Sequence, residues 1–265
     1  MPIAELPQAL LHYELAGDGA RVLTIGGTGG DLRNAPGPFA WPGAQAFTLL
    51  AYDHRGLGRS RELTDAQPTM GDFAGDALAL VDQLGWERFA VIGTSFGGMV
   101  AQELALRAGE RIERLALLCT SAGGRCGASY PLHELYALAP PQRVRTLVGL
   151  LDTRAEHDAE LAAAIAGYLE LDRSLAATDE PSAGLLRQLE ARGEHDTCER
   201  LGTLDVPTLV AAGRYDGIAP PARAKELARA IPGARLELFD GGHGFFLQDP
   251  RAWPKIAEFL AGDRP

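Results

Sequence analysis

FAVIGTSFGGMV, residues 89–100, is the stretch that decides the fold of this chain. Its unbroken apolar run up to Ile92 is typical of a strand buried on both faces, and a helical stretch follows it. Between the two, GTSFG (93–97) forms the pattern G-x-S-x-G. A tight strand-to-helix turn of this kind holds the serine in a strained backbone conformation that only small neighbours permit. It also presents the serine at the carboxyl end of a sheet, where ligands bind in open α/β folds. The pattern therefore predicts Ser95 as a nucleophile.

Short apolar runs recur along the chain, with helix-like stretches between them. Because their hydrophobicity is continuous rather than alternating, they predict the strands of a parallel α/β sheet that helices cover on both faces. The predicted strands are 21–25, 47–52, 89–92, 115–119, 208–212 and 236–239. The stretch 10–15 alternates and predicts an antiparallel edge strand. Helices are predicted over 70–84, from Ser95 to Leu106, from Pro220 or Pro221 to Ala230 and over 253–260.

The β/α alternation stops between Ser121 and Gly202, where helical segments rich in Ala and Leu take over. These segments have the pattern of amphipathic helices that pack over a sheet, and they cover 132–138, 144–151, 161–171 and 185–191. We predict a core of residues 1–120 and 203–265 and a helical cap or lid of residues 121–202. A purely structural helical subdomain is the alternative.

Two further side chains supply the chemistry that Ser95 requires. A serine hydroxyl is a poor nucleophile until a base takes its proton, and the base needs a carboxylate to orient it. His243 directly follows the last predicted strand, and Asp216 directly follows the strand before it. The order Ser, Asp, His predicts His243 as the general base and Asp216 as the orienting acid. Asp240 is the alternative acid, but a carboxylate three residues away on the same loop rarely reaches the far ring nitrogen of a histidine.

The sequence resembles the α/β-hydrolase fold enzymes, a group that includes small esterases, enol-lactone hydrolases, cofactor-free haloperoxidases and C–C bond hydrolases. The resemblance spans nearly the whole chain and rests on AYDHRGLGRS (51–60), the Ser95 turn, Asp216 and His243. It implies a mostly parallel central sheet of about eight strands with helices on both faces, and the predicted cap matches the family's variable cap only in position. The stretch D-x-R-G-x-G is a structural loop in that family. Scaffold roles are therefore implied for Asp53, His54 and Arg55.

Two backbone N–H groups are expected to form an oxyanion hole. The first belongs to Phe96, directly after the nucleophile. The second belongs to the loop GGTGGD (26–31), which follows the first predicted parallel strand. The family usually has His-Gly at the first two positions of this loop, and here Gly26 replaces the histidine. Alignment with the residue after that pair points to Thr28 as the second donor, with Gly27 as the alternative.

No cofactor and no metal are predicted. The glycine-rich loop lacks the Lys-Ser/Thr ending of a P-loop, and the third glycine of a dinucleotide fingerprint would fall on Leu32. Four histidines lie outside any catalytic or metal-ligand spacing and are expected to be surface or packing residues. They are His12, His133, His157 and His195.

The composition limits the partners and the compartment. The formal net charge is −10, and the Lys and Arg residues are scattered, which disfavours binding to nucleic acid or to an anionic membrane surface. No apolar run approaches the length of a membrane span, and the N-terminus lacks the pattern of a signal peptide. The three cysteines include no C-x-x-C pair and indicate neither a disulfide framework nor a zinc site. A reducing, cytoplasmic location is therefore expected.

These patterns predict a cofactor-independent serine hydrolase that cleaves a small to medium hydrophobic carboxylic ester through an acyl-enzyme. The Leu and Ala content of the cap predicts a mostly apolar pocket. A lactone or a C–C bond (a 1,5-diketone) is the alternative substrate, although C–C hydrolases usually have Trp where this chain has Gly244. A non-catalytic ligand-binding protein of the same fold is the alternative of another class, but such a role does not require the serine, aspartate and histidine together. The sequence makes no prediction of oligomeric state.

Overall fold

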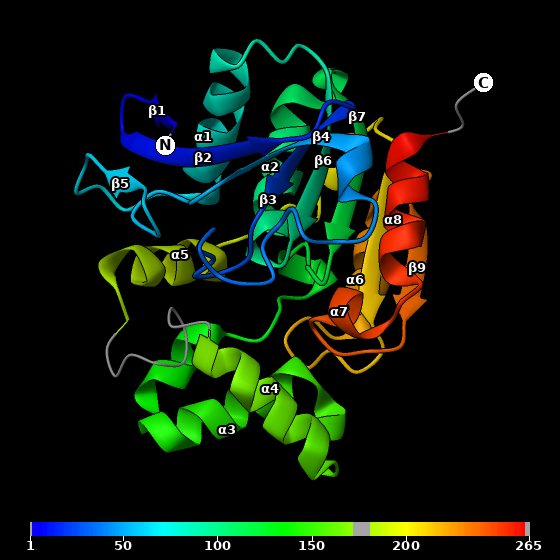
Figure 1. The fold of residues 1–265 in the computed structure, drawn as a ribbon. Coiled ribbons are helices and arrows are strands. Elements are labelled where there is room, and N and C mark those ends of the chain that lie inside the picture. Colours follow the sequence, from blue (N-terminus) through cyan, green and yellow to red (C-terminus); the bar gives the residue numbers. More distant parts are fainter. Residues whose placement is uncertain (1, 172–180, 263–265) are drawn as a thin grey trace.

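A nine-stranded mixed sheet forms the centre of the computed structural model, which describes residues 2–171 and 181–262 (Figure 1). The strands are β1 (Ile3–Glu5), β2 (Ala9–Ala16), β3 (Ala20–Ile25), β4 (Phe47–Tyr52), β5 (Arg61–Glu62), β6 (Phe89–Thr94), β7 (Ile112–Leu118), β8 (Thr208–Gly213) and β9 (Arg235–Phe239). Their order is β1-β2-β4-β3-β6-β7-β8-β9, and β5 pairs with β2 outside this path. The strands from β4 to β9 in this order are all parallel. The predicted fold class, a mostly parallel sheet with helices, is confirmed.

Strand β2 differs from its predicted place at the edge of the sheet. It pairs antiparallel with β4, as expected, but β1 pairs with its other side, and the short β5 pairs with the start of β2 opposite β1. Strands β1 and β5 have only three and two residues, too few to show an alternating pattern in the sequence.

Helices cover both faces of the sheet. One face carries α1 (Met70–Gln83), α2 (Phe96–Ala108) and α6 (Pro221–Ala230), and the other carries α7 (Phe245–Gln248) and α8 (Ala252–Ala261). Helix α1 begins with a capping box, in which Thr69 and Asp72 satisfy each other's backbone N–H groups, and Gly85 follows its end with a φ of 64°. No helix within the described ranges is long and apolar enough to cross a membrane.

The segment between β7 and β8 is helical, and it brings a small hydrophobic core of its own. Its helices are α3 (Pro140–Leu151), α4 (Ala159–Leu171) and α5 (Ala183–Gly193). Figure 1 shows α3 and α4 beyond one end of the sheet, with α5 closer to it. The predicted helix at 132–138 is a 3-10 helix over Leu132–Ala137. The boundaries of a cap at 121 and 202 remain a prediction.

The structure pairs two of the three cysteines, which corrects the prediction that they form no disulfide. Cys126 and Cys198 are bonded, with their Cα atoms 5.7 Å apart, and Cys119 is free and buried. The pairing joins residues 72 positions apart, so no local spacing could reveal it. The expectation of a reducing compartment rested on unpaired cysteines and loses that support.

Candidate active site

Ser95 occupies the turn between β6 and α2, and its backbone is strained. Its φ is 53° and its ψ is −113°, a region that residues with a side chain rarely adopt. Close packing explains why glycines flank it. A Cβ on Gly97 would lie 2.1 Å from the Ile25 carbonyl oxygen, and a Cβ on Gly93 would lie 2.5 Å from the Gly97 oxygen. The Ser95 carbonyl accepts a hydrogen bond from Thr120 Oγ1 at 2.8 Å, which helps to fix the turn.

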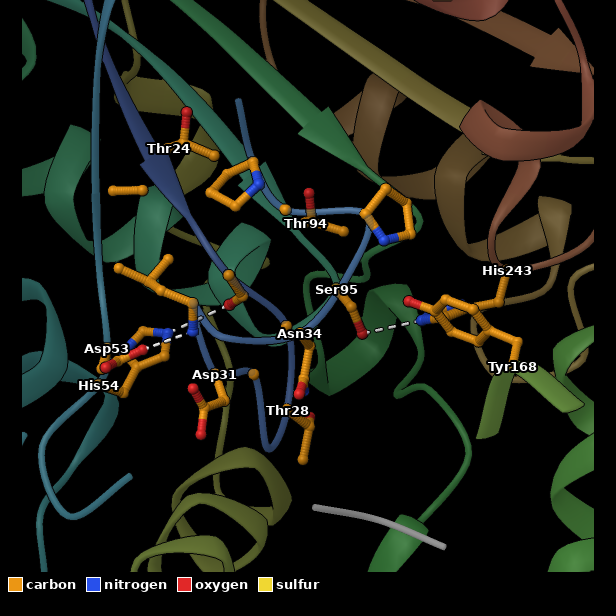
Figure 2. A pocket seen from close by; sticks show the side chains of 18 of the residues that line it. Thr24, Thr28, Asp31, Asn34, Asp53, His54, Thr94, Ser95, Tyr168 and His243 are labelled. Atoms are coloured by element: carbon orange, nitrogen blue, oxygen red, sulfur yellow. Dashed lines mark hydrogen bonds between the residues drawn. The ribbon is translucent and has the colours of Figure 1, made fainter. Parts of the chain in front are cut away.

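The structure brings Ser95, His243 and Asp216 together in one hydrogen-bonded row. Ser95 Oγ lies 3.0 Å from His243 Nε2 (Figure 2), and His243 Nδ1 lies 2.8 Å from Asp216 Oδ2. A carboxylate can only accept, so Nδ1 carries the ring proton and Nε2 is left to accept the serine hydroxyl proton. The sequence predicted all three residues, and they come from the ends of β6, β8 and β9.

The orientation of Asp216 is fixed by its own loop. Its side chain is fully buried, and its Oδ1 accepts hydrogen bonds from the Ile218 and Ala219 amides, both at 2.8 Å. Asp240, the alternative acid, instead has a side chain that is 62% exposed and pairs with Arg154 at 3.3 Å. The geometry therefore favours Asp216 over Asp240 as the partner of the histidine.

The loop that carries His243 rests on the end of helix α3. The His243 amide donates to the Leu151 carbonyl at 2.6 Å, and a Cβ on Gly242 would lie 2.0 Å from the same oxygen. The Gly242 amide donates to Gln248 Oε1, and Gln248 in turn donates to the buried Asp152 carboxylate at 3.0 Å. Contacts from the helical segment thus hold the histidine loop in place.

The glycine-rich loop after β3 lies beside the nucleophile. A Cβ on Gly27 would lie 3.6 Å from Ser95 Cβ. The Gly29 amide donates to Gln188 Oε1 and the Gly30 amide donates to the Gly27 carbonyl, whereas the Gly27 and Thr28 amides form no hydrogen bond within the described residues. The amide of Phe96, the first residue of α2, has no acceptor inside the helix. The three predicted donors, with Gly27 and Thr28 still as alternatives, are therefore free to face a ligand.

The D-x-R-G-x-G stretch supports this loop and contacts neither His243 nor the Ser95 hydroxyl. Asp53 accepts hydrogen bonds from the Leu32 amide at 2.7 Å and the Arg59 amide at 2.9 Å. Arg55 forms a two-point ion pair with Asp76, both contacts at 2.7 Å. His54 Nε2 lies 3.1 Å from the Gly26 carbonyl, and burial lowers the pKa of His54 to about 4, so its neutral ring donates to that oxygen. These contacts agree with the predicted scaffold roles.

A cavity of about 270 Å³ opens at Ser95 and His243. The helical segment contributes an apolar wall, formed by Leu132, Leu147, Leu151 and Leu169. The opposite wall is polar and includes Thr24, Asp31, Asn34, Asp53 and Thr94 (Figure 2). Within the described residues, the only charged side chains that line the cavity belong to Asp31 and Asp53, apart from the titratable His243. Each of these carboxylates pairs with an arginine outside the lining, Asp31 with Arg33 and Asp53 with Arg59, so the two charges are largely compensated. Among the described lining residues, no lysine or arginine is offered to a ligand.

Comparison with known proteins fits this geometry. The alpha/beta hydrolase fold family matches residues 26–250 of the chain. The chain belongs to the alpha/beta hydrolase fold family. It is 31% identical to a protein of Caulobacter sp. (strain K31) that is provisionally named carbamate hydrolase RutD, over 96% of this chain and 95% of that protein. It is 29% identical to the 2-hydroxymuconate semialdehyde hydrolase of Pseudomonas putida, over 92% of this chain and 88% of that enzyme.

Among solved structures, the enol-lactonase from Burkholderia xenovorans LB400 superposes with a TM-score of 0.80. The two chains are 27% identical, and the match covers 98% of this chain and all of the other. The predicted resemblance to the alpha/beta hydrolases is therefore confirmed, and hydrolase activity is the function that the family and these relatives support.

Sequence reasoning missed one residue beside the site of this alpha/beta hydrolase. Gln188 lies on helix α5, is fully buried, and binds the Gly29 amide at 2.8 Å. Its signal in the sequence is a polar residue between Leu185 and Leu189, on the face of a predicted amphipathic helix that should be apolar. A buried polar side chain needs a partner, and here the partner is the glycine-rich loop.

Proposed function

We propose that this protein is a serine hydrolase that cleaves neutral, mainly apolar carboxylic esters through an acyl-enzyme. The observation that carries the proposal is the row of contacts from Ser95 Oγ to His243 Nε2 at 3.0 Å and from His243 Nδ1 to Asp216 Oδ2 at 2.8 Å. In this arrangement Ser95 can act as the nucleophile, His243 as the general base and Asp216 as the carboxylate that orients the histidine.

In the proposed first half of the reaction, His243 Nε2 takes the hydroxyl proton as Ser95 Oγ attacks the ester carbonyl carbon. Asp216 holds the ring and stabilises the imidazolium that forms. The C–O bond to the alcohol then breaks, His243 returns the proton to the leaving alkoxide, and the acyl group stays on Ser95. In the second half, His243 activates water, which releases the acid and restores the serine.

The developing oxyanion needs donors that are already in place. The amide of Phe96 and one amide of the glycine-rich loop, from Thr28 or Gly27, supply them in this proposal. Each donor of this kind stabilises a transition state by about 3–4 kcal/mol. The positive end of helix α2 adds to the same effect because the charge develops at its N-terminus.

The walls of the cavity favour a neutral substrate. Four leucines of the helical segment would pack against an apolar acyl or alcohol group. No lysine or arginine among the described lining residues could pair with a substrate carboxylate, and burying an unpaired carboxylate is costly. A small to medium hydrophobic ester fits both features.

A lactone is a second candidate because it is a cyclic ester that the same steps would open. The structural similarity to an enol-lactonase favours this candidate. Neutral lactones are then the expected members of that class, since the cavity wall disfavours an added carboxylate.

The test is hydrolysis of p-nitrophenyl esters from acetate to octanoate by the wild type and by Ser95→Ala. We expect turnover by the wild type and background rates for the variant. A fluorophosphonate probe checks the nucleophile separately from the choice of substrate: it should label Ser95, as located by peptide mass spectrometry, and His243→Ala should slow the labelling. Labelling at another residue, or equal turnover by Ser95→Ala, would disprove the proposed mechanism.

A further inference from the structure

A second cavity, of about 110 Å³, lies where the end of helix α5 meets the segment that follows β7. It shares no lining residue with the cavity at Ser95. Apart from Met99 of α2, its walls come from two segments, which are joined by the Cys126–Cys198 disulfide and by the bridge between Gly123 and Asp196. The disulfide and the bridge therefore fix the positions of the segments that line the cavity relative to each other.

The polar groups of this cavity are buried and incompletely hydrogen-bonded. Arg192 is 7% exposed, His195 is 5% exposed and Ser121 is fully buried, and all three line the cavity. Within the described residues, Arg192 Nη1 and Ser121 Oγ form no hydrogen bond, and the His195 ring interacts with the Ser121 backbone but forms no hydrogen bond of good geometry. Buried polar atoms nearly always find a partner in the protein, a water or a bound ion. Their convergence on one cavity points to a bound species.

The charge of the cavity is positive. The Arg192 Nη2 atom donates to Ser129 Oγ at 2.7 Å and to the Tyr130 carbonyl at 3.1 Å, but both acceptors are neutral. Burial lowers the pKa of Arg192 to about 10, so the guanidinium still carries its charge at neutral pH. Asp216 attracts this charge without contacting it. A buried charge without a paired counter-ion is costly, and an anion in the cavity would supply one.

The neighbours of Arg192 can donate to the same anion. Burial lowers the pKa of His195 to about 4, so the ring is neutral and keeps one N–H donor. The Ser121 hydroxyl supplies a second donor. A water molecule occupies about 30 Å³ in the liquid, so the cavity has room for an anion of up to about four heavy atoms but not for a sugar phosphate or a nucleotide.

We propose that Arg192, His195 and Ser121 form a binding site for a compact monoanion, either a halide such as chloride or a small carboxylate such as formate or acetate. The anion would neutralise the guanidinium and join the end of α5 to the segment after β7. Because α5 also carries Gln188, occupancy would stabilise the helix that holds the glycine-rich loop. The inference stands apart from the proposed function, since it concerns stability and binding.

Thermal unfolding in sodium salts tests this site. Chloride, bromide, formate or acetate replaces gluconate at constant ionic strength, because gluconate is too large for the cavity. We expect a saturable rise of the melting temperature by about 2–4 °C with at least one of these anions. A response to the halides alone identifies a halide site, and a response to formate or acetate alone identifies a carboxylate site.

Arg192→Gln should abolish the rise, and the control Arg229→Gln should keep it, because Arg229 is exposed and pairs with Glu226. Should Arg192→Gln fail to fold, Ser121→Ala, which removes only one donor, should weaken the affinity several-fold. If the halides give the response, crystals of the wild type grown in bromide should show anomalous scattering next to Arg192 Nη1. No saturable response to any of the four anions would overturn the proposal, and so would a halide response in solution with only water in the cavity of the bromide crystals.

Discussion

Gln188 on helix α5 accepts a hydrogen bond from the Gly29 amide, 2.8 Å long, between residues 159 positions apart in the chain. Both groups are buried. The contact ties the helical segment between β7 and β8 to the loop that carries Gly27 and Thr28, which lies beside Ser95. The helical segment thus does more than line the cavity, because it also holds the loop that carries the proposed oxyanion donors.

Replacing Gln188 tests this positioning role. Gln188→Met keeps the length of the side chain but removes the acceptor, so the glycine-rich loop should lose its fixed position. We expect kcat for a p-nitrophenyl ester to fall about 10-fold with little change in KM, because the loop acts on the transition state. Gln188→Glu keeps the acceptor and should recover part of kcat. Leu186→Ala, at an exposed position on the same helix, serves as the control. A rise in KM at unchanged kcat would point to a role in substrate binding instead.

The acid of the proposed triad can be assigned with two matched variants. Asp216→Asn should lower kcat by about 10³- to 10⁴-fold, because an amide would stabilise the wrong tautomer of His243. Asp240→Asn should keep nearly full activity, since its exposed carboxylate pairs with Arg154 and not with the histidine. Steady-state kinetics on one ester distinguishes Asp216 from Asp240 as the acid, and circular dichroism checks that both variants fold. Equal losses in the two variants would contradict the assignment.

The Cys126–Cys198 disulfide should contribute to stability. It closes a long loop that includes α3, α4 and α5, so the double variant Cys126→Ser/Cys198→Ser should lose about 2–4 kcal/mol in the free energy of unfolding. Urea unfolding with and without a reductant measures this loss. Thiol titration of the denatured protein should find one free thiol before reduction and three after it, from the three cysteines of the chain. Three free thiols without reduction would show that the bond is not formed.

The parts that the sequence predicts well are those in which a local pattern determines the structure. The apolar run 47–52 matches β4 and the proline-started helix 221–230 matches α6, because burial on both faces and helix-start signals act within a few residues. The Ser95 turn is equally local, because any side chain larger than that of glycine at its flanking positions would clash within the turn or with β3. Asp216 and His243 could be predicted because parallel strands bring their carboxyl ends to one edge of the sheet.

The features that the sequence does not predict depend on contacts between distant segments. The pairing of Cys126 with Cys198 and the contact of Gln188 with Gly29 each join segments that only the tertiary fold brings together. The apolar wall of the cavity could not be predicted from the sequence either. Leucines recur throughout the helical segment, and only the packing of α3 and α4 decides that Leu147 and Leu169 face Ser95.

The lack of a lysine or arginine among the described lining residues of the cavity predicts a preference for neutral esters. We expect kcat/KM for p-nitrophenyl butyrate to exceed that for mono-p-nitrophenyl succinate, which is similar in length but carries a carboxylate, by about 10-fold or more. Asp31→Asn should reduce this ratio because it leaves the Arg33 guanidinium beside the cavity without its carboxylate partner. Asp65→Asn, at an exposed position outside this wall, is the matched control. A faster reaction with the succinate ester would indicate a cation at the site and a different substrate class.

The buried His54 should make the stability of the protein depend on pH. Burial lowers its pKa from 6.5 to about 4, so the unfolded chain takes up a proton as the pH falls below 6.5, whereas the folded chain does not until about pH 4. The free energy of unfolding should therefore fall across this window and level off below it. The contribution of His54 is about 2 kcal/mol between pH 7 and pH 5.

Urea unfolding at these two pH values measures the effect of His54. His54→Gln, whose amide can still donate to the Gly26 carbonyl, should lose about 2 kcal/mol less than the wild type between pH 7 and pH 5. His157→Gln, at an exposed position, should follow the wild type and controls for loss of a histidine as such. A His54→Gln variant with the full wild-type pH dependence would show that His54 takes up its proton in the folded protein as readily as in the unfolded chain. In that case the ring would have access to water, and its hold on the glycine-rich loop would be weaker than the 3.1 Å contact indicates.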